Sequence, residues 1–278
     1  MAAPLPTPER LSAPPPWALA HVPGLAGGEP PLAVVRLAGG SVNRVFRVDS
    51  RRGSFVLRLN GAAWLRPAVD RERELVLHRA ASAAGVAPPI VDADPASEGL
   101  LITEFEQGRP WCDADYEDVA ALHRLGERLQ ALHALPAPAV AAFDPWSIAQ
   151  QYLHQIEALA RAPPPERPLA QFERSCAMLR SNPLPACIAH GDLAQNNLLD
   201  GDRLWLLDWE YAQRGDAMMD VACVLAYYPG ARRHGAELAA ATGIQGHLTR
   251  EALALRVYIY QALSWLWHLA RGEPAQPP

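Results

Sequence analysis

The sequence contains no lysine, and its 25 permanently basic residues are all arginines. We attribute this bias, together with the abundance of alanine and proline, to GC-rich coding rather than to function. The 25 basic residues are set against 30 acidic ones, so the formal net charge of −5 is modest. No basic cluster is dense enough to indicate binding to nucleic acid or to an acidic membrane surface. The composition therefore predicts a protein with neither kind of partner.

Cysteine is scarce as well, and its four residues, Cys112, Cys176, Cys187 and Cys223, are scattered. Because they form no CxxC pair and no His/Cys cluster, a reduced protein of the cytosol is expected. A charge-free apolar run of about eighteen residues is lacking, which argues against a membrane-spanning helix. Prolines interrupt residues 1–16, where a signal peptide would need a continuous apolar stretch. We expect a soluble cytoplasmic protein that is a monomer or a homodimer.

The first third of the chain predicts a small α+β lobe behind a flexible arm. Residues 1–31 are rich in proline, alanine and glycine, which favours a loosely held arm. Alternating apolar residues and glycine-containing turns then predict an antiparallel meander, and a helical spacing of apolar residues follows it. The expected strands are 34–37, 42–48, 55–59, 86–91 and 100–105, with a helix over 70–84. We place this lobe at residues 32–105.

The rest of the chain, residues 106–278, is predicted to be mostly helical, with two short apolar strands near its middle. Residues 187–189 and 204–207 flank the segment that starts at His190, and we expect them to form a hairpin-like arrangement. Amphipathic spacing predicts the helices of this lobe. They are expected over 116–135, 145–160, 169–179, 218–227, 236–242 and 250–271.

Two carboxylates and one amide lie in the segment between and just after these two strands. Asp192 is followed by Asn197 five positions later, and Asp208 comes at the end of the second strand. One carboxylate can orient or deprotonate an attacking hydroxyl. The amide oxygen and the other carboxylate can hold Mg²⁺ on nucleotide phosphates. Phosphoryl transfer depends mainly on positioning and charge neutralisation, so this small set is sufficient for it.

The run His190-Gly191-Asp192, with Asn197 and the segment Leu206-Leu207-Asp208-Trp209-Glu210-Tyr211-Ala212, resembles the catalytic and metal loops of the aminoglycoside phosphotransferase and choline kinase family. The residue pattern is similar to that of the choline-kinase and bacterial thiamine-kinase branches of this family, and the resemblance covers residues 33–271. It implies a bilobal, protein-kinase-like fold that uses ATP and Mg²⁺. By this likeness, Asp192 is the catalytic base, Asn197 and Asp208 are metal ligands, and His190 braces the loop. Ordinary polar turn residues would be the alternative.

The same resemblance implies a nucleotide site in the first lobe. The turn that contains Gly40, Ser41 and Asn43 would lie over the phosphates, although a plain hairpin turn has the same composition. Arg58 would replace the usual lysine on the α- and β-phosphates, and Glu74 on the following helix would hold it, with Glu72 as a competitor. A solvated helix face is the alternative for both glutamates. The hinge between the lobes, which would bind adenine through its backbone, is expected at Glu104, Phe105 and Glu106.

The acceptor is predicted to be a small molecule held by aromatic residues. Tyr211 and one of Trp265 and Trp267 would surround a cationic group, as in choline kinases, while the other tryptophan packs. Packing of both in the helix core is the alternative. Glu210 would help with metal or substrate, or only brace the loop. Ala194 and Tyr227 replace polar residues common in choline kinases, so thiamine-like acceptors fit equally well. An aminoglycoside-modifying kinase and a catalytically silent binding module are the other hypotheses.

Overall fold

The computed structural model describes residues 13–37, 43–61, 68–96, 99–244 and 250–278. Contacts along the chain separate two compact units. The smaller comprises residues 1–61 and 90–105, and the larger comprises residues 62–89 and 106–278. The α+β class expected from the sequence is confirmed, with an antiparallel sheet in the smaller unit and mostly helices in the larger. The domain limits drawn from the sequence stay a prediction, and the helix expected over 70–84 groups by contacts with the larger unit.

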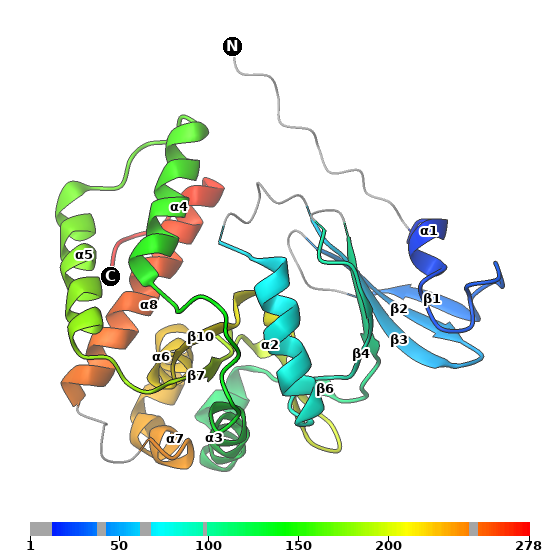
Figure 1. Ribbon diagram of the computed structural model, residues 1–278. Helices are drawn as coiled ribbons and strands as arrows, with labels where there is room; N and C mark the ends of the chain where they lie inside the picture. Colours follow the sequence, from blue (N-terminus) through cyan, green and yellow to red (C-terminus); the bar gives the residue numbers. More distant parts are fainter. Residues whose placement is uncertain (1–12, 38–42, 62–67, 97–98, 245–249) are drawn as a thin grey trace. The chain divides into compact units, whose positions relative to one another are not determined.

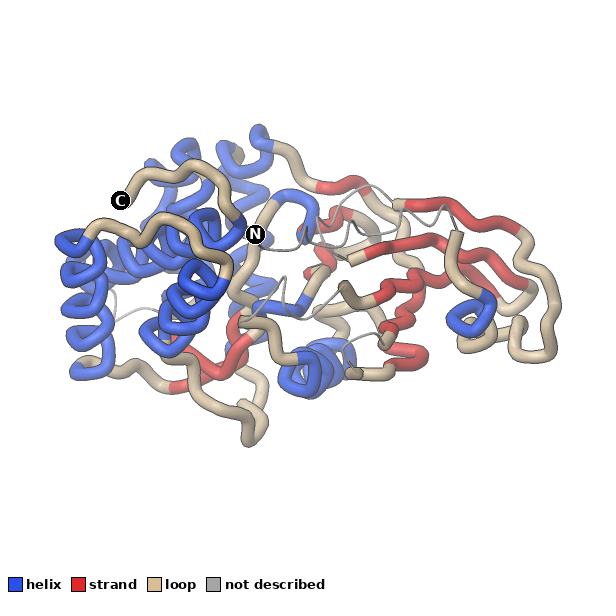
Figure 2. The backbone as a smooth tube through the Cα atoms, turned by 90° about the horizontal axis from the view of Figure 1, so that it is seen from above, coloured by secondary structure: helices blue, strands red, loops and turns tan. Residues whose placement is uncertain are grey.

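A five-stranded antiparallel sheet forms the smaller unit, in the order β1-β2-β3-β5-β4. Every second residue of the central strands points to one face, as the pleat requires, and that face carries the core. Phe46 and Val48 on β2 and Leu57 on β3 are fully buried there. Figure 2 shows the strands in red, side by side. Their bounds are β1 (Ala33–Arg36), β2 (Arg44–Ser50), β3 (Gly53–Leu59), β4 (Ile90–Ala93) and β5 (Leu100–Glu104).

From residue 13 onward, the predicted flexible arm is instead packed on this sheet. It contains a short helix, α1 (Pro16–Leu19), and its residues Ala18, Val22 and Leu25 belong to the core of the unit. The hydroxyl of Ser50 at the end of β2 donates a hydrogen bond of 2.7 Å to the carbonyl of Pro23. The expectation of a loose arm is thus wrong for this part, because three apolar side chains among the prolines and glycines reach the core.

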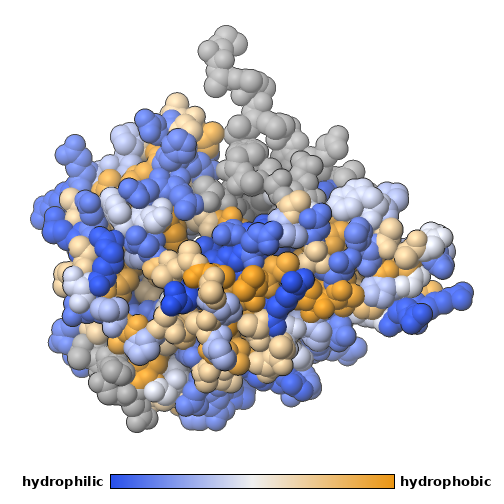
Figure 3. Space-filling view, viewed as in Figure 1, coloured by the Kyte–Doolittle hydropathy of each residue, from blue (hydrophilic) through white to orange (hydrophobic). Residues whose placement is uncertain are grey.

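Helices make up most of the larger unit, and α8 packs against α4, α5 and α6 (Figure 1). Aspartates cap several of them, for example Asp118 at α3 and Asp144 at α4. Hydrophilic side chains cover much of the visible face of α4 and α5 (Figure 3). Among the described residues, no helix combines the length and apolarity needed to cross a membrane. The helices are α2 (Arg71–Ala83), α3 (Val119–His133), α4 (Pro145–Ala158), α5 (Glu166–Ser181), α6 (Met218–Tyr227), α7 (Gly235–Ala241) and α8 (Arg250–Arg271).

Two small antiparallel sheets in this unit replace the hairpin expected from the sequence. Strand β7 (Ala186–Ala189) pairs with β10 (Gln213–Asp216), and β9 (Leu204–Leu206) pairs with β8 (Leu198–Asp200), which also pairs with β6 (Arg109–Pro110). Direct pairing of 187–189 with 204–207 was therefore a wrong prediction. The physical reason is that β8 and β9 are joined by a tight turn, so they pair locally, and β7 receives the strand that follows Asp208.

The packed arm leads to a stability prediction. Leu25 is 3% exposed in the core of the smaller unit, whereas Leu32 in the same segment is 67% exposed. Leu25→Ala should lower the free energy of unfolding by about 2 kcal/mol or more, because truncating a buried leucine to alanine leaves a cavity. Leu32→Ala, the matched control, should change it by less than about 0.5 kcal/mol. Urea unfolding measures both, and equal effects would contradict the packing of the arm.

Candidate active site

The hairpin of β8 and β9 brings Asn197 and Asp208 together, although eleven positions separate them in sequence. Leu198 is paired with Leu206, and the N–H of Leu207 donates to the carbonyl of Asn197 at 2.8 Å. Asp208 itself has φ 57° and ψ 75°, in the left-handed region that aspartate tolerates better than most residues. This unusual backbone ends the strand sharply and turns the next residues into a short 3₁₀ helix, Trp209–Tyr211.

Asn197 is bound directly to Asp192. Its Nδ2 atom donates to the Asp192 Oδ2 atom and to the Asp192 carbonyl, both at 2.9 Å. Because the amide nitrogen faces Asp192, the Oδ1 atom of Asn197 lies on the opposite side of the amide. The predicted base and the predicted metal ligand are thus held in one geometry, with the amide fixing the carboxylate and directing its own oxygen elsewhere.

His190 is buried and connects the loop of Asp192 with the loop of Asp208. Its Nε2 atom lies 2.9 Å from the Leu207 carbonyl, which can only accept, so Nε2 carries the proton. The Asp192 N–H donates to Nδ1 at 3.3 Å. Burial lowers the pKa of His190, which agrees with a neutral ring. The ring also packs edge-on against Trp209, 4.8 Å between centroids. These contacts support the bracing role predicted for His190.

Asp220 on α6 holds the start of the same loop. Its carboxylate accepts from the N–H of His190 at 3.0 Å and of Gly191 at 2.8 Å, and from His133 Nε2 at 2.9 Å. Burial alone would raise the pKa of this fully buried carboxyl, but the hydrogen bonds from His133 and the Gly191 N–H outweigh burial and lower it. Asp220 is therefore a buried anion that fixes two consecutive backbone amides.

Gly191 fits only as glycine. Its φ of +77° lies in the region that favours glycine, and a Cβ there would lie 2.6 Å from the Tyr211 carbonyl oxygen. The loop of Asp192 therefore passes very close to the segment that follows Asp208. Any side chain at Gly191 would push the two loops apart.

Three tyrosines, none of which was predicted for this purpose, hold three further backbone groups of the loop. Tyr116 donates to the Leu193 carbonyl at 2.9 Å, Tyr228 accepts from the Gln195 N–H at 2.8 Å, and Tyr260 donates to the Gly191 carbonyl at 3.0 Å. The rings of Tyr116 and Tyr228 are also stacked. Because the three tyrosines come from distant parts of the sequence, no local pattern indicates these contacts.

Glu74 and Glu210 share an arginine in the larger unit. Arg71 Nη1 lies 2.7 Å from Glu74 Oε2 and 3.3 Å from Glu210 Oε2. Both carboxylates are buried, whereas Glu72 is exposed, which favours Glu74 over Glu72 as the inward-facing residue. Of the two roles predicted for Glu210, these contacts support bracing, since they tie its loop to α2.

The other residues predicted to bind nucleotide are distributed as follows. Asn43 is buried and accepts from the Gly61 N–H at 3.1 Å, and Arg58 is buried on β3, with Nη2 3.3 Å from the Asn60 amide oxygen. Gly40 and Ser41 lie outside the described residues. The predicted hinge, Glu104, Phe105 and Glu106, falls where the chain passes from the smaller unit to the larger. The roles assigned to these residues stay predictions.

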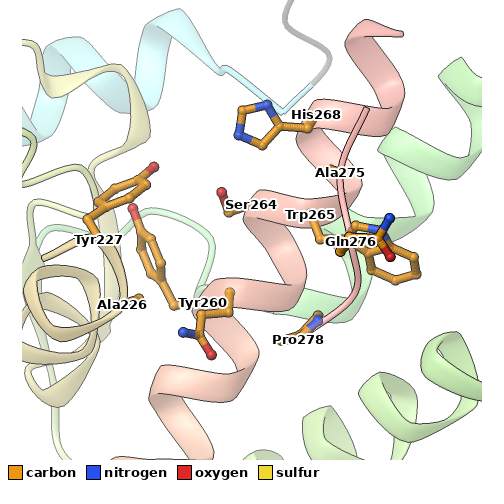
Figure 4. A pocket seen from close by; sticks show the side chains of 10 residues that line it. Ala226, Tyr227, Tyr260, Ser264, Trp265, His268, Ala275, Gln276 and Pro278 are labelled. Atoms are coloured by element: carbon orange, nitrogen blue, oxygen red, sulfur yellow. The ribbon is translucent and has the colours of Figure 1, made fainter. Parts of the chain in front are cut away.

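Of the aromatic residues predicted for the acceptor, two meet. Trp267 Nε1 donates to the hydroxyl of Tyr211 at 3.1 Å, whereas Trp265 is 3% exposed and belongs to a hydrophobic core. A cavity of about 260 Å³ lies beside Trp265, between the end of α6 and α8 (Figure 4). Tyr227 at the end of α6 meets Tyr260 of α8 edge-on, with 5.3 Å between the ring centroids. Ser264 and His268 line the cavity from α8 as well (Figure 4). Through Tyr260, this cavity adjoins the loop of Asp192.

Comparison with known proteins decides the family. A model of the phosphotransferase enzyme family matches residues 33–256, which is most of the chain. The chain belongs to this family. The matched segment spans both units and includes the loops of Asp192 and Asp208. The family predicted from those loops is therefore confirmed.

The chain is also similar to individual proteins. Protein LicA of Haemophilus influenzae is 26% identical over 198 residues, 67% of this chain, and the chain spans 56% of that protein's length. A choline/ethanolamine kinase family protein from Mesorhizobium loti is 27% identical, with a TM-score of 0.71 over 94% of this chain and 87% of its own. Choline kinase LicA from Streptococcus pneumoniae is 17% identical, with a TM-score of 0.73 over 91% and 90%. The last likeness shows a shared fold, which confirms the predicted kinase-like architecture.

The buried carboxylate of Asp220 leads to a second prediction. Asp220→Asn replaces one acceptor oxygen by a donor, so a backbone N–H or His133 loses its partner. We expect the free energy of unfolding at pH 7 to fall by about 3 kcal/mol. Because the folded-state pKa of Asp220 is lowered, its stabilisation is complete above about pH 4, the unfolded value, and is lost at lower pH.

Urea unfolding of both proteins between pH 3 and pH 7 (about the range over which an ordinary aspartate titrates) measures this difference. The difference in the free energy of unfolding between the wild type and Asp220→Asn should shrink as the pH falls. A gap that grows toward acid would mean that Asp220 is protonated in the folded protein, which would contradict the account given for its pKa.

Proposed function

We propose that this protein transfers the γ-phosphoryl group of ATP to a hydroxyl group of a small, cationic or amino-bearing metabolite. The observation that carries the proposal is the arrangement of Asp192, Asn197 and Asp208. Asn197 holds the carboxylate of Asp192 at 2.9 Å, and the β8–β9 hairpin places Asp208 beside Asn197. A carboxylate next to two oxygen ligands is the set that phosphoryl transfer requires.

In the proposed reaction, Asp192 orients the acceptor hydroxyl and receives its proton. The hydroxyl oxygen forms a bond to the γ-phosphorus while the bond from that phosphorus to the bridging oxygen of ADP breaks. The products are ADP and a phosphate monoester of the acceptor. The contact from Asn197 keeps Asp192 Oδ2 in one position, which favours a productive alignment before the reaction.

The residues fit a magnesium ion bound together with nucleotide phosphates. Carboxylate and amide oxygens are the ligands that Mg²⁺ prefers, and Mg²⁺ usually takes one or two from the protein and others from phosphates and water. Asp208 and the Oδ1 atom of Asn197 would be those two. Within the described part of the chain, no cluster of three or more His, Cys, Asp or Glu residues could hold a metal. Mg²⁺ would neutralise charge on the phosphates when bound.

We place the acceptor in the cavity beside Tyr260, because it adjoins the catalytic loop and has an aromatic lining. None of its lining residues is Asp or Glu. A polycation such as an aminoglycoside is usually held by carboxylates, so this lining favours a smaller acceptor whose cationic group is bound by aromatic rings. The names of the similar proteins, choline and choline/ethanolamine kinases, support the same class of acceptor. A thiamine-like acceptor fits the same chemistry.

The catalytic assignment is tested by Asp192→Asn, with Asp113→Asn, an exposed aspartate on another element, as the matched control. Release of ADP from MgATP is followed with choline, ethanolamine and thiamine as acceptors. Asp192→Asn should lower kcat by about 10²- to 10⁴-fold, the usual contribution of a general base, while ATP binding persists. Asp113→Asn should leave kcat unchanged.

Two results would contradict the proposal. A folded Asp192→Asn protein with wild-type turnover would remove Asp192 from the reaction. A wild-type protein that binds no ATP in the presence of Mg²⁺ would favour the catalytically silent binding module. Phosphorylation of aminoglycosides, together with resistance in a sensitive host, would instead assign the chain to antibiotic modification.

A further inference from the structure

The last residues of the chain form one wall of the acceptor cavity. After α8 ends at Arg271, the chain reverses and runs back along the helix (Figure 4). Ala275, Gln276 and Pro278 then line the cavity, opposite Tyr227 (Figure 4). We call residues 273–278 the tail. Ala275 also packs against the hydrophobic core that contains Trp265. The cavity thus has one wall that is not part of any helix or strand.

A specific turn produces this reversal. Gly272 has φ +79°, a conformation that glycine adopts without strain, and it directly follows the end of α8. The N–H of Glu273 donates to the carbonyl of His268 at 2.9 Å, which closes the turn. Arg161 donates to the carbonyls of Leu269 and Ala270, so the last turn of the helix is itself held in place. The direction in which the tail leaves α8 is therefore fixed.

The carboxylate of Glu273 attaches the tail to two side chains of α8. Its Oε2 atom lies 2.7 Å from His268 Nδ1, and its Oε1 atom lies 2.7 Å from Arg271 Nε. The hydrogen bond from Arg271, followed by that from His268, lowers the pKa of Glu273, so the carboxylate is charged at neutral pH. Since an ionised carboxylate only accepts, Nδ1 of His268 carries a proton.

The same cluster reaches the loop that follows Asp208. The guanidinium of Arg271 lies 4.6 Å from the ring centroid of Trp267, and Trp267 donates to the Tyr211 hydroxyl. A continuous series of contacts therefore joins Glu273, Arg271, Trp267 and Tyr211. The tail is connected both to the cavity, through His268, and to the segment next to the predicted metal ligand.

We propose that the tail determines acceptor specificity: attached by Glu273 to His268 and Arg271, it limits the size of the group that the cavity accepts. This inference rests on the proposed function, since it takes the cavity as the acceptor site. The tail lines the cavity, whereas Asp192 and Asn197 are not among its lining residues, so loosening the tail should change the choice of acceptor and leave ATP binding intact.

The first test compares the kcat/KM values for choline and ethanolamine, which differ by three N-methyl groups. Glu273→Gln weakens the attachment without changing the size of the side chain. It should raise the choline-to-ethanolamine ratio by about fivefold or more, because a few methyl groups in a pocket give discrimination of this order, with KM for ATP unchanged. Glu127→Gln is the matched control, since Glu127 forms an exposed ion pair with His123 on α3.

An unchanged ratio in Glu273→Gln, with wild-type activity toward both acceptors, would overturn the tail's role. Inactivity of the wild type toward every acceptor would instead overturn the proposed function. The two failures are therefore distinguishable.

A second measurement needs no turnover. In a protein whose exposed Cys112 is replaced by serine, Ala275→Cys places a single reactive thiol in the tail, because the remaining cysteines are buried. Adding Glu273→Gln should raise the rate of alkylation by iodoacetamide about fivefold or more, as expected if an ordered segment becomes mobile. Glu127→Gln should leave the rate unchanged. Equal rates in all three proteins would show that Glu273 does not hold the tail, which would overturn the proposal by itself.

Discussion

One buried carboxylate, that of Asp220, fixes the geometry on which the candidate site depends. It accepts hydrogen bonds from two consecutive backbone amides, those of His190 and Gly191, and from His133. A buried anion is stable only when such donors surround it. The two amides therefore cannot move without exposing an uncompensated charge. Because Asp192 follows them directly, its position is determined by an interaction that does not involve Asp192 at all.

Hydrogen bonds to the backbone hold the rest of the site in place as well. The His190 ring donates to the carbonyl of Leu207, one residue before Asp208, and so links the loop of Asp192 to that of Asp208. Tyr116, Tyr228 and Tyr260 hold three further backbone groups of the loop. A phosphoryl-transfer site gains most from charges and ligands that are already in position, because little rearrangement is then needed in the transition state. The extensive anchoring of this short loop is consistent with that requirement.

Much of this arrangement could be predicted from the sequence, and the limits have physical reasons. The helices and the central sheet follow from apolar periodicity, and the spacing of Asp192, Asn197 and Asp208 predicted the loops. The pairing of β7 with β10 was missed because short apolar strands carry no information on their partners. The anchoring tyrosines were missed because their contacts join residues far apart in the chain. The packed arm was missed because its high proline and glycine content indicated a loose segment, although three of its apolar residues belong to the core.

The central claim is transfer of a phosphoryl group to an alcohol by the loop of Asp192. The most direct test is phosphorus NMR of the wild-type protein with MgATP and each of choline, ethanolamine and thiamine. The account predicts the signal of a phosphate monoester from one of these acceptors, formed in equal amount to ADP and absent with Asp192→Asn. Release of inorganic phosphate as the sole product, or the same monoester with Asp192→Asn, would contradict it.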